Sequence, residues 1–64
     1  MSIPFQTYSL KKEQLEVTFQ IYVAEAIVSF FDKDGVAVSR ESYGLDRARK
    51  EWRVLKTQGY KRVL

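Results

Sequence analysis

Apolar and polar residues alternate strictly through one segment in the first half of the chain. The apolar positions are Leu15, Val17, Phe19, Ile21 and Val23, separated by Glu16, Thr18, Gln20 and Tyr22. A period of two over this length is typical of a β-strand with one buried and one solvated face. The segment is rich in β-branched and aromatic residues, which also favour strands. We therefore expect a strand over residues 15–23.

The next segment, Ala26 to Phe31, is apolar on both strand faces except at Ser29. This pattern indicates either a central strand covered on both sides or a strand whose outer face is a binding surface. The link Ala24-Glu25 contains no Gly, Pro or Asn. It leaves open a turn or a bulge within one long bent strand.

A turn is strongly indicated at Asp32-Lys33-Asp34-Gly35, because Asp opens such turns and Gly accepts the left-handed conformation. The return strand runs over Val36–Tyr43 and becomes polar, as edge strands do. The turn also resembles the start of an EF-hand loop. Its Gly comes too early and no flanking helices are indicated, so we expect no metal site.

From Leu45 the period changes to that of a helix, with an apolar stripe at Leu45, Ala48, Trp52 and Leu55. Gly59 suits the position after the helix, where a Schellman motif would place Tyr60 against Leu55. We expect a helix over 45–58 whose stripe covers the sheet face carrying Val17, Phe19 and Ile21. Trp52 is the expected centre of that core.

The fold class that follows is α+β: a three- or four-stranded antiparallel β-meander, then one amphipathic C-terminal helix packed on the sheet. One small domain spans 1–64, with the meander over 15–43 and a cap and tail over 59–64. The sequence leaves three alternatives for the structure of residues 1–14. They form a strand near Phe5–Leu10, a helical turn near Ser9–Glu13, or a partly ordered segment. The tail either adds a short strand or frays.

The amino-acid composition excludes several kinds of site chemistry. The 64 residues include no cysteine and no histidine, which excludes disulfides, thiolate or imidazole metal ligands, and nucleophile–histidine catalysis. The carboxylates fall mostly in turns or on polar faces, and no pair is forced into a dry pocket. We expect no enzyme activity, no cofactor and no metal.

No stretch approaches the roughly 20 apolar residues that a membrane span needs, so no membrane partner is expected. The run Met1–Phe5 has neither a charged leader nor an apolar core and does not read as a signal peptide. Together with the lack of cysteine, these features predict a cytoplasmic protein.

Charge is unevenly distributed. The net charge is +3, but residues 1–39 carry −2 and residues 40–64 carry +5. The candidate basic face consists of Arg47, Arg49, Lys50, Arg53, Lys56, Lys61 and Arg62. On a helical wheel, Arg49, Arg53 and Lys56 lie on one flank of the apolar stripe. This face either contacts phosphates, with tyrosines as stacking planes, or is an ordinary solvated helix surface.

Val54 and one of the two adjacent phenylalanines resist assignment to the core. The candidate apolar or aromatic patch consists of Tyr22, Phe30, Phe31 and Val54. Val54 lies opposite the apolar stripe of the helix, and the two phenylalanines point to opposite faces of their strand. Either Ile3, Phe5 or Tyr8 covers the outer ring, or the patch binds a partner or a second copy of the chain.

The helix and its cap follow the pattern Ala-Arg-x-x-Trp-x-x-Leu-x-x-x-Gly-aromatic, carried here by Ala48, Trp52, Leu55, Gly59 and Tyr60. This pattern resembles the ending of many short cyanobacterial and phage proteins, in which a small sheet precedes such a helix. The resemblance covers about a quarter of the chain. It implies the fold and a bacterial cytoplasmic setting, and it implies no activity.

These observations predict a small non-enzymatic interaction protein that binds a protein partner. It would be either a regulatory or accessory subunit or a self-associating domain, and a homodimer is one form of the latter. The alternative is a nucleic-acid-binding domain that uses the basic C-terminal helix on phosphates.

Overall fold

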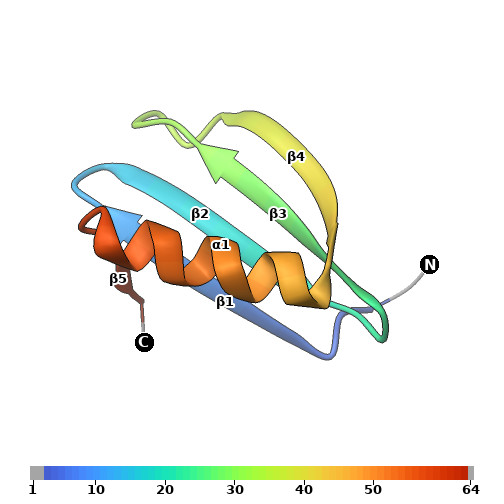
Figure 1. Ribbon diagram of the computed structural model, residues 1–64. Coiled ribbons are helices and arrows are strands. Elements are labelled where there is room, and N and C mark those ends of the chain that lie inside the picture. The colour runs from blue at the N-terminus through green and yellow to red at the C-terminus, as the bar shows by residue number, and fades with distance from the viewer. Residues whose placement is uncertain (1–2, 64) are drawn as a thin grey trace.

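The structure is a computed structural model that describes residues 3–63 (Figure 1). It contains a five-stranded antiparallel sheet and one helix, an α+β fold as predicted. The elements in chain order are β1 (Gln6–Lys12), β2 (Leu15–Ile21), β3 (Glu25–Phe31), β4 (Ala37–Gly44), α1 (Leu45–Thr57) and β5 (Lys61–Arg62). Met1, Ser2 and Leu64 of the predicted end segments lie outside the described residues.

The sheet order is β4-β3-β2-β1-β5, so the first four strands form a meander. The helix then returns the chain along one face of the sheet (Figure 1). This places β5 antiparallel to β1, with Leu10 opposite Arg62. The predicted meander therefore has four strands, because β1 forms, and the tail adopts its predicted alternative of a short added strand, β5. The alternative of a helical turn near Ser9–Glu13 is not adopted, since β1 continues to Lys12.

Three tight turns join the strands of the meander, and the first, between β1 and β2, places Glu13 at a φ of 57°. The link between β2 and β3 is a true turn, closed by the Tyr22 N–H donating to the Glu25 carbonyl at 2.8 Å. In the next turn, Oδ1 of Asp32 accepts hydrogen bonds from the N–H groups of Asp34 and Val36 at 2.9 and 3.0 Å. Gly35 adopts a φ of 78°, which confirms the role predicted for this glycine.

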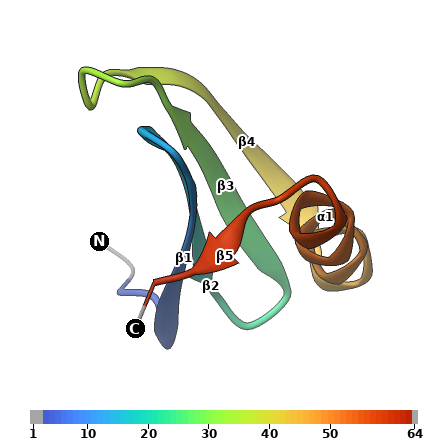
Figure 2. The same ribbon diagram turned by 90° about the vertical axis from the view of Figure 1, so that its left-hand side faces the viewer.

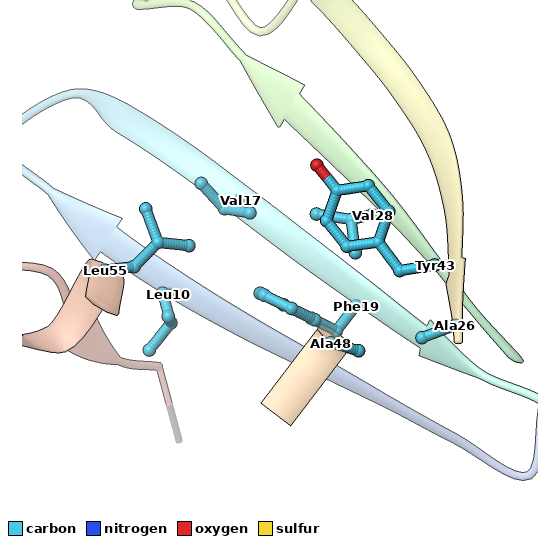
Figure 3. Packing of buried hydrophobic residues seen from close by; sticks show 8 residues of the cluster. All are labelled: Leu10, Val17, Phe19, Ala26, Val28, Tyr43, Ala48 and Leu55. Atoms are coloured by element: carbon cyan, nitrogen blue, oxygen red, sulfur yellow. The ribbon is translucent and has the colours of Figure 1, made fainter. Parts of the chain in front are cut away.

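The core lies between the sheet and α1 (Figure 3). Its buried residues are Leu10, Val17, Phe19, Ala26, Val28, Tyr43, Ala48 and Leu55. The helix covers the strand face predicted, but the alternating pattern overstates the buried length of β2. Leu15 and Val23 are 41% and 77% exposed, because they lie at the two hairpin turns that flank β2.

Trp52 is not the centre of the core. It is half-buried, whereas Phe19 is 2% exposed and is the largest fully buried side chain. Phe19 and the small Ala48 both belong to this buried cluster between the helix and the sheet (Figure 3). Trp52 packs against the edge of this cluster, and that position leaves part of its indole accessible.

The helix ends in the predicted Schellman motif. The Tyr60 N–H donates to the Leu55 carbonyl at 3.1 Å, and the Gly59 N–H donates to the Lys56 carbonyl at 3.3 Å. Gly59 has a φ of 101°, a conformation that favours glycine. At the other end Gly44 is the N-cap residue, and no side chain of the described residues caps the first turn.

The opposite face of the sheet is not covered by a helix within residues 3–63 (Figure 2). Phe31 lies on this face, and Phe30 lies on the helix side. Of the two alternatives for this face, coverage by the N-terminal segment is not adopted: Ile3 and Phe5 are 85% and 72% exposed, and Tyr8 packs on the helix side. Among the described residues no helix is both long and apolar enough to cross a membrane.

Candidate binding groove

A groove of about 550 Å³ lies between one flank of α1 and the strands β1 and β2. Six apolar or aromatic side chains line it: Tyr8, Phe19, Ile21, Leu45, Ala48 and Trp52. Tyr8, Ile21, Leu45 and Trp52 are only half-buried. The groove therefore presents apolar surface to solvent, in the size range of ordinary ligand pockets.

Three arginines complete the lining together with Gln6: Arg49, Arg53 and Arg62. Arg49 and Arg53 are four positions apart and so share one face of α1. Arg62 reaches the same site from β5, because its register opposite Leu10 places its side chain on the helix side of the sheet. Among residues 3–63, no carboxylate lines the groove. We call this site, with its ten lining residues, the arginine groove.

The aromatic side chains of the arginine groove support one another. Trp52 meets Tyr8 and Phe19 edge to face, with ring centroids 5.8 and 5.2 Å apart. The Arg62 guanidinium lies over the Tyr8 ring, with Cζ 5.0 Å from the centroid. The Tyr8 hydroxyl donates a hydrogen bond to Oε1 of Gln6. These contacts limit the rotamers of the lining, which preorganises the site.

The structure brings together only some residues of the predicted basic face. Arg49, Arg53 and Arg62 come together, but Arg47 lies on the other flank of α1, where its Cζ is 4.1 Å from the centroid of the Tyr43 ring. Lys50 and Lys56 are exposed and are not part of the lining. Lys61 alternates with Arg62 and pairs with Lys11, so its side chain lies on the opposite sheet face.

The predicted apolar patch is likewise not one surface. Phe30 packs against the core, Phe31 lies on the uncovered face, and Val54 is exposed on α1. Tyr22 lines a second, more open hollow at the β2–β3 turn. Its other lining residues are Ile3, Phe5, Val23, Ala24, Glu25, Ile27 and Arg40.

Tyr43 is a core residue, and its surroundings shift the pKa of its phenol. Burial raises the pKa of the Tyr43 phenol above 10.0, and the neighbouring Glu41 carboxylate raises it further. The Arg47 guanidinium acts in the opposite direction. Tyr43 lies outside the arginine groove, so this shift concerns stability and not binding.

Sequence reasoning missed Tyr8 and Gln6 as site residues. Both lie on β1, a segment whose state the sequence left open, and their place in the site depends on α1 packing beside β1. The alternation of Gln6, Tyr8 and Leu10 was the available signal, because a strand would align these three side chains on one face.

Within residues 3–63, no three His, Cys, Asp or Glu side chains gather in a way that would hold a metal ion. Comparisons of the chain with protein-family models, curated proteins and solved structures give no significant match. The geometry of the arginine groove is therefore the basis for a functional proposal.

Proposed function

We propose that this chain is a small non-enzymatic interaction protein whose arginine groove binds an acidic region of a partner protein. The observation that carries this proposal is the convergence of Arg49, Arg53 and Arg62 around an apolar floor, with no carboxylate among the described lining residues. Arginine, tryptophan and tyrosine are the residues most enriched at the energetic centres of protein interfaces. All three types meet in this groove.

Electrostatics favours an anionic ligand. Three guanidinium groups that line one groove repel one another and gain from a carboxylate partner, which arginine can bind through two parallel hydrogen bonds. The segment 40–64, which supplies all three arginines, carries a net charge of +5. Such a field also accelerates association with acidic partners.

Nucleic-acid binding is the second candidate, and the same three arginines support it. Stacking of bases requires open aromatic faces. The Tyr8 ring is already faced by Arg62, and Trp52 contacts two other rings edge to face. Arg47, Lys50 and Lys61 are also directed elsewhere and do not extend a continuous basic track. The groove therefore supports a protein partner better.

A third candidate is self-association of the chain through a different surface. Ile3, Phe5 and Val23 are each more than 70% exposed near the β2–β3 turn. Sedimentation of the purified chain, with a Phe5→Ser variant for comparison, measures whether this apolar surface joins two copies. A strict monomer at high concentration would exclude this arrangement.

Affinity purification from the native cell tests the main proposal. The bait is the tagged chain, compared with Arg49→Glu/Arg53→Glu and with the control Lys33→Glu/Lys50→Glu. Both variants change the net charge equally, and both alter exposed residues, but the control positions lie outside the groove. We expect a partner retained by wild type and control and lost by the groove variant.

A partner retained equally by all three baits would contradict the proposal. Binding of generic DNA or RNA with a steep loss at higher salt, abolished by the groove variant alone, would favour the nucleic-acid alternative.

A further inference from the structure

The arginine groove also indicates the local sequence of its ligand. We infer that it binds an extended segment in which two acidic residues flank one apolar residue, a ligand class that rests on the proposed function above. The inference uses the spacing of the helix arginines, the position of the apolar floor and the absence of acidic residues from the described lining.

The spacing of the arginines matches an extended peptide. Arg49 and Arg53 are four positions apart on α1, a rise of about 6 Å along the helix axis. Side chains at alternate positions of an extended strand point to the same side and are about 6.6 Å apart. Carboxylates at positions i and i+2 of such a segment therefore face the two guanidinium groups together.

The residue between the two carboxylates points the opposite way, away from the helix arginines. On that side of the groove lie Tyr8 and Ile21, both half-buried on the strands. An apolar side chain placed there removes its own surface and theirs from water, which is the main source of affinity for such contacts. A charged residue at this position would lose its hydration against an apolar wall.

Arg62 supplies the third guanidinium group of the arginine groove. Its guanidinium lies over the Tyr8 ring, and Arg62 as a residue is exposed to solvent. A further acidic residue in the ligand, or a terminal carboxylate, can pair with it without displacing the apolar residue. The resulting ligand pattern is acidic–apolar–acidic, strengthened by one more negative charge.

Trp52 makes the inference directly measurable. It is the one tryptophan of the chain and it lines the groove, so its fluorescence reports occupancy. Three blocked peptides serve as probes: Ser-Glu-Leu-Glu-Ser, its isomer Ser-Leu-Glu-Glu-Ser, and the neutral Ser-Gln-Leu-Gln-Ser. The isomer has the same charge and composition, but its adjacent carboxylates point to opposite sides of an extended chain.

We expect saturable binding of the first peptide at millimolar or lower concentration. The isomer and the neutral peptide should each bind at least about tenfold more weakly, because each loses one or both charge-assisted hydrogen-bonded pairs. Binding should disappear in Arg49→Glu/Arg53→Glu, weaken in the milder Arg49→Gln/Arg53→Gln, and persist in Lys33→Glu/Lys50→Glu. Circular dichroism of each variant checks that it is folded.

Equal affinity for the first peptide and its isomer would overturn the inferred spacing, and so would no saturable response to any peptide. An oligothymidylate that binds the groove more tightly than the first peptide would overturn the peptide as ligand. The peptide titration tests only the inferred ligand pattern. The proposed function is tested separately, by whether the groove variant loses a partner in the affinity purification.

Discussion

The guanidinium of Arg62 lies over the ring of Tyr8, with 5.0 Å between Cζ and the ring centroid. This contact joins β5 to β1 on the helix side of the sheet, beyond the two residue pairs that connect their backbones. It also holds one of the three arginines at the rim of the groove. One pair of residues thus contributes both to closing the sheet and to shaping the site.

Replacing Arg62 with Ala should lower the free energy of unfolding by about 0.5–1 kcal/mol, the usual worth of an exposed cation–π pair. Arg62→Lys should retain part of this, since it keeps the charge but loses the planar stack. Urea denaturation measures both. Lys61→Ala is the matched control on the opposite sheet face and should change stability little; an equal loss there would assign the effect to β5 pairing alone.

The different burial of Phe19 and Trp52 predicts which of them contributes more to the free energy of unfolding. Phe19→Ala removes a side chain that is 2% exposed and should cost about 3–5 kcal/mol, enough to unfold most of a chain this small. Trp52→Ala should cost less, because the indole is only half-buried. Thermal unfolding followed by circular dichroism compares them. A more severe effect of Trp52→Ala would restore tryptophan as the core centre.

Gly59 and Gly44 should respond to substitution in opposite directions. Gly59→Ala should destabilise the protein by about 1 kcal/mol because φ is 101°, and the new Cβ itself would make only an ordinary contact, 3.4 Å from Cε of Lys12. Gly59→Asn should be milder, since Asn accepts left-handed conformations better. Chemical denaturation of the two variants gives the difference.

Gly44→Asp should raise stability by about 0.5–1 kcal/mol, a few tenths of it from the new N-cap hydrogen bond and the rest from the lower entropy of the unfolded chain. Gly44 is the N-cap in an extended conformation and lacks a capping side chain, and a Cβ added there would meet no atom of the described residues within 4 Å. Aspartate would accept a hydrogen bond from the first turn and would also reduce the entropy of the unfolded chain. Gly44→Ala lowers the entropy of the unfolded chain in the same way but supplies no cap, so in the same denaturation experiment it should gain less than Gly44→Asp.

The raised pKa of Tyr43 predicts that the protein loses stability in alkaline solution. Its pKa is raised in the folded protein, so well below pH 10.0 both states keep the proton and the full contribution is present. Above this pH the unfolded chain releases the proton first, and stability falls until the pH passes the raised folded pKa. The stability of wild type relative to Tyr43→Phe should fall as the pH rises through 10.0 and should level off once the raised folded pKa is passed. A constant difference would contradict the shift.

The local elements could be predicted because their signals are short in range. The alternation around Val17 and Phe19 identified a strand, Asp32 and Gly35 identified a turn, and the cap at Gly59 ended the helix. Each depends on residues within a few positions of one another. β5 could not be placed in the same way, because two residues form a strand only where β1 offers an open edge.

The binding groove illustrates the limit of such reasoning. The helical wheel placed Arg49 and Arg53 on one flank, but it could not say what faces that flank. Tyr8 and Arg62 reach it from the two ends of the chain, through strand pairing that no local pattern specifies.

The sequence by itself determined the fold class, the apolar stripe of α1 and the concentration of positive charge after residue 40, because periodicity and capping are properties of neighbouring residues. Only the tertiary structure decided that Trp52 borders a groove, that Arg62 joins Arg49 and Arg53, and that Arg47 and Lys61 do not. The physical reason is that the groove exists between elements, where strand register and helix packing select which side chains meet.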